Sequence, residues 1–284
     1  MNRRTNESEL LTDEKETIIY LGSRNEDFKN FIYSLCKKGK LVPKYLDFLT
    51  NEESLCQYSK AFTATSADEV NNYEVFEQLG DTTANKFLVW YFNRRFPFLN
   101  NADGVKVIAR LRINYGARAS FQSIAKSLGF WDFISASEED RSRNMKKLLE
   151  DVFEAFVGVT EYLLDNHFRE GVGYAIVYTI LKSIFDNMDI SLKYEDLFDA
   201  KTRLKELCDM YKTQLTNLNY KYEKDIQTNL VTSTVFLNNI EIASGTASLK
   251  IDAEQRAAKT AIIILNKKGF VKQIPHIYST FRHM

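Results

Sequence analysis

The feature that most constrains the fold is a short acidic and apolar stretch, YEVFEQLGD, at Tyr73–Asp81. It places Glu77 and Asp81 four residues apart, and residues at this spacing are neighbours on one face of an α-helix, with Cβ atoms about 5–6 Å apart. The apolar residues of this stretch and of the segment after it include Phe76, Leu79, Phe87 and Trp90. Their spacing predicts one buried stripe on a helix that also carries the two carboxylates.

A second stretch of the same kind, KLLEDVFEAFVG, lies at Lys147–Gly158. Asp151 and Glu154 are three residues apart and therefore share one helical face. Each acidic pair has a glycine beside it, Gly80 in the first stretch and Gly158 in the second, and glycine lets another backbone approach closely. Two helices that cross at these glycines would bring four carboxylates together.

Two interpretations of these acids follow from the residues alone. Acidic pairs at helical spacing are most often a solvated helix face of little energetic consequence. If the four carboxylates do meet, each raises the pKa of the others unless a cation is present, and hard oxygen ligands favour Mg²⁺ or Mn²⁺. The three cysteines and three histidines are scattered and form no competing metal or nucleophile pattern.

Both acidic strings resemble motifs of the ribonuclease III family. YEVFEQLGD resembles the family signature, whose usual form reads NERLEFLGD, and KLLEDVFEAFVG resembles the second acidic motif, A-D-x-x-E-A-x-I-G. AFTATS at Ala61–Ser66 resembles the upstream A-L-T-H-x-S segment, with Ala64 in place of the family's histidine. Val105 and Val107 stand where family members often carry acids. The three motifs occur in family order and spacing, and the chain is identified as a member of this family.

The resemblance implies a metal-dependent endoribonuclease that cleaves double-stranded RNA. The positions that match the family's catalytic metal ligands are Glu77, Asp81, Asp151 and Glu154. It further implies two Mg²⁺ ions per site, which Mn²⁺ can replace, activating a water and stabilising the leaving 3′ oxygen. Glu74 and Lys147 match supporting positions. The chain is expected to act as a homodimer in which each site cuts one strand and leaves a 5′ phosphate and a short 3′ overhang.

The chain also predicts two domains of different class. No strand pattern appears before residue 200, which predicts an all-α first domain, whereas a helix at Lys201–Lys212, three period-two runs and an Ala-rich helix at Asp252–Leu265 follow. Helix, three strands, helix resembles the order of a double-stranded-RNA-binding domain. The expected divisions are a mobile tail at 1–22, the endonuclease domain at 23–195, the small α+β domain at 199–268 and a basic tail at 269–284.

The second resemblance implies RNA contacts and some losses. Thr202 and Glu206 match helix contact positions, and Lys250 matches the first of two phosphate-binding lysines. Ile251 replaces the second lysine, and the strand loop at 225–229 lacks the family's Gly-Pro-x-His type of sequence. Residues 199–284 carry 13 Lys and Arg against 8 Asp and Glu, although the net charge of the whole chain is zero. Packing or protein contact is therefore an open alternative for this domain.

Composition places the chain among ordinary globular proteins, with 44% hydrophobic and 27% charged residues. No apolar run reaches the roughly 18 residues of a membrane span, and the polar N-terminus does not resemble a secretory signal. Isolated cysteines indicate a reducing intracellular compartment. The expected partners are double-stranded RNA and a second copy of the chain, with no membrane and no small-molecule cofactor. The alternative functions are a catalytically silent RNA-binding or ribosome-associated scaffold and a protein that sequesters duplex RNA.

Three local patterns in the sequence predict a helix start, a loop and a turn. Thr50 and Glu53 have the spacing of a capping box and predict the start of a helix. The charged, Ser- and Asn-rich residues 135–147 predict a loop before the second acidic helix. Asn238-Asn239, between two period-two runs, predicts a hairpin turn.

Overall fold

The helix predicted around the first acidic pair spans Glu74–Arg95 (α4), and the one around the second pair spans Met145–His167 (α8). They are part of a computed structural model that describes residues 17–276 and Tyr278. Most of the N-terminal tail expected at residues 1–22 lies outside the described residues, as do residues 277 and 279–284 of the expected basic C-terminal tail.

The chain divides into two compact units. The first comprises the described part of Met1–Pro97 together with Leu111–Met188, and the second comprises Phe98–Arg110 together with the described part of Asp189–Met284. Helix α5 (Gly104–Tyr115) therefore begins in the second unit and ends in the first. The domain boundaries expected from the sequence stay predictions.

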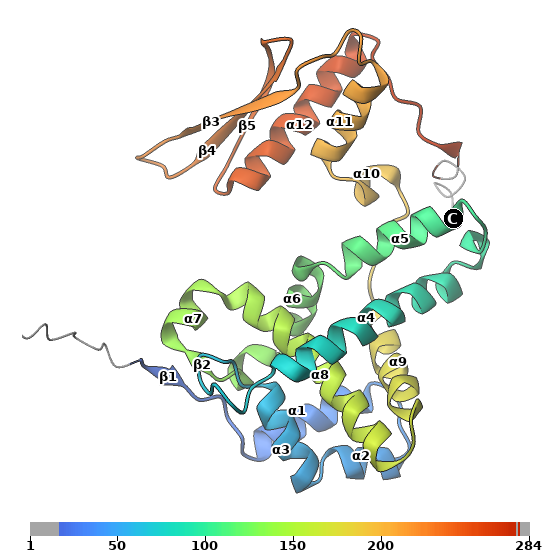
Figure 1. The fold of residues 1–284 in the computed structure, drawn as a ribbon, viewed down its shortest axis with the longest axis vertical. Coiled ribbons are helices and arrows are strands. Elements are labelled where there is room, and N and C mark those ends of the chain that lie inside the picture. Colours follow the sequence, from blue (N-terminus) through green and yellow to red (C-terminus); the bar gives the residue numbers. More distant parts are fainter. Residues whose placement is uncertain (1–16, 277, 279–284) are drawn as a thin grey trace, which may run out of the picture. The chain divides into compact units, whose positions relative to one another are not determined.

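The first unit is a group of helices arranged around α8. Figure 1 shows α8 passing through the middle of this unit, with α4 crossing it. Between Leu148 and Thr160, every residue of α8 except Glu150 is buried. The other helical elements in this part of the chain are α1 (Glu26–Lys37), α2 (Pro43–Leu49), α3 (Glu52–Ala61), the 3₁₀ turns η1 (Pro97–Leu99) and η2 (Phe130–Phe133), α6 (Arg118–Ser127), α7 (Glu138–Arg143) and α9 (Val172–Phe185). The all-α class predicted for this part is confirmed.

Helices α4 and α8 cross at their two glycines, as the sequence predicts. A Cβ atom added to Gly80 would lie 1.7 Å from the carbonyl oxygen of Glu154, and one added to Gly158 would lie 2.0 Å from that of Phe76. Both separations are far below any real contact, so each position is restricted to glycine by the other helix. The two backbones therefore meet directly at this point.

The predicted buried stripe of α4 is only half correct. Phe76 and Phe87 are buried, but Leu79 and Trp90 are 44% and 48% exposed. The crossing at Gly80 fixes which side of α4 faces α8, and the buried residues of the helix are Phe76, Gly80, Thr83, Ala84, Phe87, Leu88, Tyr91 and Phe92. Leu79 is rotated by about 100° from Gly80 and so leaves the interface.

Two local predictions from the sequence are wrong, the start of helix α3 and the loop at residues 135–147. Helix α3 is capped by Asn51, whose side chain accepts a hydrogen bond from the Ser54 amide at 2.8 Å, while the Thr50 hydroxyl donates to the carbonyl of Leu46 instead. The predicted loop at 135–147 contains the strand β2 (Ala136–Ser137) and α7, and α8 already begins at Met145. Ser137 caps α7 by accepting from the Asp140 amide, an N-cap signal that outweighs the polar composition.

A half-buried arginine, Arg24, links the start of the described chain to the body of the first unit. The Arg24 guanidinium donates to the hydroxyl of Ser59 at 2.8 Å and to the carbonyl oxygens of Phe133 and Phe62 at 2.7 and 3.1 Å. Burial lowers the pKa of Arg24 to about 10. Close by, the two-residue strand β1 (Ile19–Tyr20) pairs antiparallel with β2. This short ladder is a small addition to the all-α prediction.

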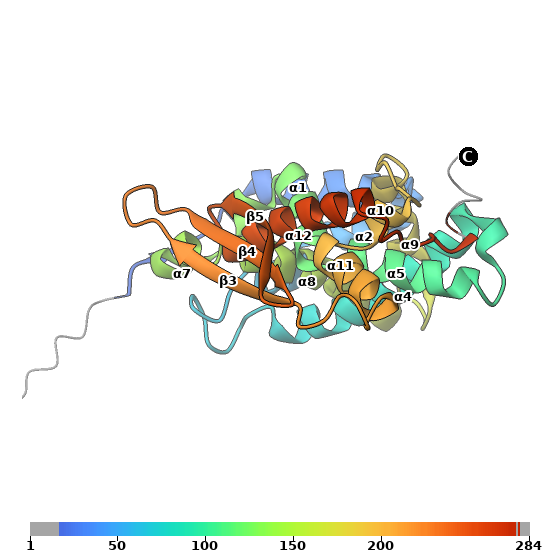
Figure 2. The ribbon, with the colours of Figure 1, turned by 90° about the horizontal axis from the view of Figure 1, so that it is seen from above.

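The second unit is a three-stranded antiparallel sheet with helices packed on it. Its elements after residue 189 are α10 (Tyr194–Leu197), α11 (Ala200–Met210), β3 (Asn219–Lys224), β4 (Val231–Leu237), β5 (Ile240–Ala247) and α12 (Lys250–Lys267). The strand order is β3-β4-β5, and Figure 2 shows α12 lying along the sheet. This confirms the α+β class predicted here. None of the described helices is both long and apolar enough to cross a membrane.

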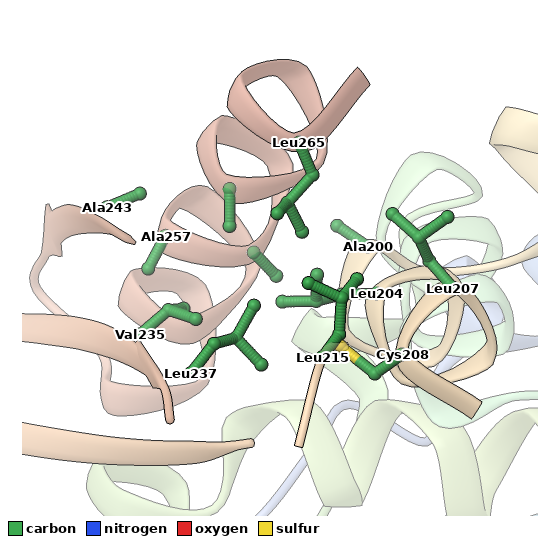
Figure 3. Packing of buried hydrophobic residues seen from close by; sticks show 12 residues of the cluster. Ala200, Leu204, Leu207, Cys208, Leu215, Val235, Leu237, Ala243, Ala257 and Leu265 are labelled. Carbon is green, nitrogen blue, oxygen red and sulfur yellow. The ribbon is translucent and has the colours of Figure 1, made fainter. Parts of the chain in front are cut away.

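The core of this unit lies between the two helices and the sheet. Leu204 of α11 lies between Leu237 of β4 and Leu265 of α12 (Figure 3), and all three are buried in one cluster with Leu207 and Val235. Small alanines on α12 let the helix approach the sheet.

The hairpin turn predicted at Asn238-Asn239 is confirmed. Both residues have positive φ, +52° and +62°, which is the requirement of a type I′ turn and is met readily by asparagine. This turn sets the register in which Leu237 pairs with Ile240.

The crossing makes a prediction about stability. Gly158→Ala should lower the free energy of unfolding by about 3 kcal/mol or more, because the added methyl overlaps the Phe76 carbonyl and the backbones must separate. Gly171→Ala is the matched control, since Gly171 has φ +86° and no atom within 4 Å of its added Cβ, and it should cost only ~1–2 kcal/mol. Chemical denaturation measures both. Equal losses would contradict the close crossing.

Candidate active site

The crossing of α4 and α8 gathers the predicted acids around one hollow. A cavity of about 390 Å³ opens there, lined by Glu74, Val75, Glu77, Gln78, Asp81 and Glu154. Three of the four predicted catalytic acids therefore line one cavity, together with Glu74, the predicted supporting acid. The fourth, Asp151, does not line it.

Asp151, on the same helix as Glu154, is buried and is held by two neighbours. Its side chain is only 2% exposed, and its Oδ2 accepts a hydrogen bond of 2.9 Å from the Tyr73 hydroxyl. The Lys147 ammonium, predicted as a supporting group, lies 3.7 Å from the same oxygen. Tyr73 was missed by sequence reasoning, because a contact between residues 78 positions apart leaves no local pattern. The arrangement fixes the orientation of the Asp151 carboxylate.

Asp81 has a different support. The Asn85 side-chain amide donates to Asp81 Oδ1 at 2.7 Å, and the Arg112 guanidinium donates in turn to Asn85 Oδ1 at 3.2 Å. Gly116 keeps the turn after α5 close to α4, since a Cβ there would lie 2.8 Å from the Arg112 carbonyl oxygen and 3.1 Å from Leu88. A relay of two hydrogen bonds thus connects this turn to the site.

Burial and like charge together make ionisation of the site costly. Burial, with the charge of Asp81 and then Glu150, raises the pKa of Glu154 to about 9. Burial, with the charge of Asp151 and then Glu74, raises the pKa of Glu77 to about 7. Asp151 also has a raised pKa because of burial, although the Tyr73 hydrogen bond and Lys147 oppose the shift. The site therefore holds protons at neutral pH that isolated carboxyl groups would have lost.

A sixth acid, Glu150, belongs to this group and was not predicted. Its side chain is 12% exposed and forms an ion pair with Nε of Arg118, the first residue of α6. Burial raises the pKa of Glu150, and Arg118 opposes that shift. The two residues are 32 positions apart, and no spacing rule connects them.

The donor set fits a hard divalent cation, although the side chains are not arranged as a finished metal site. All candidate ligands are carboxylates, the donors that Mg²⁺ and Mn²⁺ prefer. Within residues 17–276 and Tyr278, no three His, Cys, Asp or Glu side chains are already positioned to hold one ion together. Carboxylates on one hollow can reach a shared ion by rotating their side chains, so Glu77, Asp81 and Glu154 are the first candidates.

The residues predicted to contact RNA in the second unit already contact other groups of the unit. The Thr202 hydroxyl donates to Asp199 at 2.6 Å, and Glu206 accepts hydrogen bonds from Tyr194 and Lys272. The ammonium of Lys250 lies 3.7 Å from the ring centroid of Tyr222. Their roles in RNA binding stay predictions.

A buried acid, Glu254, lies among these residues and was missed by sequence reasoning. It is 6% exposed, pairs with Lys201 and accepts a hydrogen bond of 2.6 Å from Tyr222. Ile251, which replaces the second phosphate-binding lysine, is 69% exposed nearby in sequence. The N-terminal end of α12 thus presents one cation, one buried anion and one apolar side chain.

Known proteins resemble the chain over both units. Residues 200–265 match the family described as double-stranded RNA binding motif. A protein assigned as a ribonuclease 3 in Invertebrate iridescent virus 6 is 39% identical over 284 residues, covering 93% of this chain and 96% of that protein. The ribonuclease 3 of Oenococcus oeni is 32% identical over 199 residues, covering 67% of this chain and 79% of that one. A solved nuclease domain of Campylobacter jejuni ribonuclease III has 27% identity and a TM-score of 0.41, and the match covers 53% of this chain and 100% of that one.

These similarities define the class: a nuclease unit followed by a double-stranded-RNA-binding motif. The chain belongs to the ribonuclease III family and is an endoribonuclease. The family membership, the enzyme class and the double-stranded-RNA-binding fold predicted from the sequence are confirmed.

The raised pKa of Glu154 predicts a pH-dependent stability of the protein in chelator. Below about pH 4.5, the ordinary value, Glu154 is protonated in both folded and unfolded states; above it, the unfolded chain ionises while the folded chain keeps its proton up to about pH 9. Wild-type stability should therefore fall as pH rises through this window. Glu154→Gln lacks this ionisation. Relative to wild type, its free energy of unfolding should therefore increase by on the order of 1–3 kcal/mol as the pH is raised to 8, since one pKa unit corresponds to ~1.4 kcal/mol.

Thermal unfolding of both proteins from pH 5 to pH 9 measures this difference. Glu139→Gln on α7 is the control, because Glu139 is 69% exposed and its removal should give a difference that does not grow with pH. A constant difference for Glu154→Gln across the range would refute the buried, charge-repelled environment assigned to this residue.

Proposed function

We propose that the protein cleaves double-stranded RNA by metal-dependent hydrolysis, leaving 5′ phosphates and short 3′ overhangs. The proposed metal ligands and catalytic residues are Glu77, Asp81, Asp151 and Glu154, and the proposed ions are two Mg²⁺ per site, with Mn²⁺ as a substitute. The observation that carries the proposal is the glycine crossing of α4 and α8, which brings acids from two helices to one hollow. We also propose that the enzyme works in a reducing intracellular compartment, in keeping with the free thiols of Cys36, Cys56 and Cys208.

The electrostatics of the hollow support a cation there. Carboxylates whose pKa values are raised by burial and by one another are relieved by a bound positive charge. When bound, the metal would supply an activated water and stabilise negative charge on the leaving oxygen. The chain's own residues orient the ligands: Tyr73 holds Asp151, Asn85 holds Asp81, and Lys147 places a further positive charge at the edge of the site.

The exposed side of α4 supports the homodimer. Val75, Leu79 and Trp90 are 68%, 44% and 48% exposed, and their spacing puts them on one stripe of the helix. Val75 also lines the acidic hollow, so the stripe runs along the edge of the active site. A second copy that covers the stripe would bring its own hollow near the first, as cutting both strands of one duplex requires.

The metal proposal predicts a separation of binding from cutting. Asp81→Asn and Glu154→Gln keep side-chain size and remove a charged ligand, so both variants should bind duplex RNA but cleave it at least ~100-fold more slowly. Wild type should cut with Mg²⁺ or Mn²⁺ and not in chelator, and Mg²⁺ should raise its unfolding temperature more than that of the variants. Cleavage that persists in excess chelator would disprove metal dependence.

The dimer proposal is tested with mixed dimers. Glu154→Gln protein unfolded and refolded with excess wild type should give dimers with one competent site. These should release duplexes cut on one strand only, because each site serves one strand. Separate labels on the two strands, read on native and denaturing gels, measure this. Mixed dimers that make only double-strand cuts, or none, would contradict one site per strand.

For the second unit, we propose that it holds the duplex through its phosphates. Lys250→Ala should weaken binding to every duplex sequence alike and reduce the slope of log affinity against log salt by ~0.9, the contribution of one phosphate contact. Lys259→Ala is the control, because Lys259 lies nine residues further along α12 and therefore on its opposite face. Filter binding in chelator at several salt concentrations measures both. Equal slopes for the two variants would remove Lys250 from the RNA contacts.

A further inference from the structure

The turn between α5 and α6 contributes two arginines to the neighbourhood of the acids. Arg112, in the last turn of α5, reaches Asp81 through Asn85, and Arg118, the first residue of α6, pairs directly with Glu150. Glu150 is the residue before Asp151 on α8, so both connections end at or next to a predicted metal ligand. One short segment thus borders the acidic group from the α4 side and from the α8 side.

Arg118 differs from an ordinary surface ion pair in the environment of its partner. Its own side chain is 60% exposed, while that of Glu150 is 12% exposed. The guanidinium also feels the charges of Asp151 and Glu154, although Glu150 is its direct partner. The pair therefore anchors one exposed cation next to the buried carboxylates of Asp151 and Glu154. An arginine has five N–H donors, and the contact through Nε uses one of them.

The position of Arg118 would reduce the electrostatic repulsion between the acids and an RNA substrate. An RNA duplex presents a phosphate charge at every nucleotide, and the six neighbouring carboxylates repel it. A guanidinium can bind a phosphate through two parallel N–H bonds, which both neutralises and positions it. Arg118 suits the binding of a phosphate, because Glu150 holds its guanidinium in one position beside the hollow. A lysine without such a partner would position the phosphate less well.

We propose that the α5–α6 turn forms a phosphate-binding edge of the active site, in which Arg118 contacts an RNA phosphodiester and Glu150 positions Arg118. This inference rests on the proposed function, since it assumes that duplex RNA enters the acidic hollow. Glu150 acts through Arg118 and is not assigned as a metal ligand. Arg112 has a separate part, since it orients Asn85, which holds Asp81.

The first test measures binding without cutting, with duplex RNA longer than the roughly 16 base pairs that a double-stranded-RNA-binding domain spans. In chelator, Arg118→Ala should weaken binding about fivefold and reduce the log–log salt slope by ~0.9. Arg118→Lys keeps the charge and should keep most of the slope. Lys182→Ala on α9 is the control, because it removes the cation of another half-exposed ion pair, that with Asp186, and should leave the slope unchanged. An unchanged slope for Arg118→Ala overturns the proposal.

The second test separates the roles of the two residues. Glu150→Gln should bind the duplex at least as tightly as wild type, with the wild-type slope, but cleave a bound duplex more slowly in a single turnover, because Arg118 is no longer held. The double variant Arg118→Ala, Glu150→Gln should cleave no more slowly than Arg118→Ala alone, as expected when one residue acts through the other. Losses that multiply in the double variant would overturn the positioning role.

Failure of this inference can be told apart from failure of the proposed function. If wild type does not cut duplex RNA with Mg²⁺, the proposed function fails while the binding slopes in chelator still test the phosphate contact. If wild type cuts and Arg118→Ala keeps the wild-type slope, only the phosphate-binding edge is wrong. Thermal unfolding of each variant checks that it is folded, and Arg118→Lys gives a second reading should Arg118→Ala be unstable.

Discussion

The direct backbone contact of α4 and α8 at Gly80 and Gly158 is the constraint on which the rest of the first unit depends. Neither position accepts even a methyl group, because the opposing carbonyl oxygen occupies the space. With that distance fixed, the carboxylates one turn to either side must share a hollow. Helix α8 is apolar on its remaining faces and buried through most of its length, so Asp151 and Glu154 cannot turn away to solvent. Packing of apolar neighbours thus holds charges together that would otherwise separate.

This arrangement explains which parts of the site could be predicted. The acids and glycines are close in sequence, and helical spacing alone places them on one face, so the crossing followed from the residues. The exposure of Leu79 could not be predicted in this way. Helix α4 is apolar on two sides, and the spacing of apolar residues does not tell which side faces the core. Asn51 and Thr50 are both good N-caps, and only the backbone angles choose between them. Tyr73 and Arg118 meet their acids across long sequence separations, where no spacing rule applies.

The second unit shows how sequence matching can overstate charge. Lys250 stands at a phosphate-binding position, yet its neighbour Glu254 brings a buried carboxylate to the same end of α12 and pairs with Lys201. Tyr222 donates to Glu254 and lies under the Lys250 ammonium, so the cation and the anion are joined through one ring. The local charge is therefore smaller than the count of lysines suggests. On the proposed function, a duplex bound by this unit would therefore meet a smaller net positive charge at this end of α12 than the lysines alone would give.

On the proposed function, the acids of the nuclease unit oppose the binding of an RNA phosphate. The six acids of this group repel an RNA phosphate, and burial together with their mutual repulsion raises the pKa of Glu154 well above the ordinary range. A bound cation removes both repulsions at once. On the proposed function, metal and RNA therefore bind cooperatively. If bound metal raises the affinity for RNA by some factor, bound RNA raises the affinity for the metal by the same factor. On the same proposal, the cations at the border, Lys147 beside Asp151 and Arg118 beside Glu150, lower the repulsion that remains and leave the centre of the hollow to the metal.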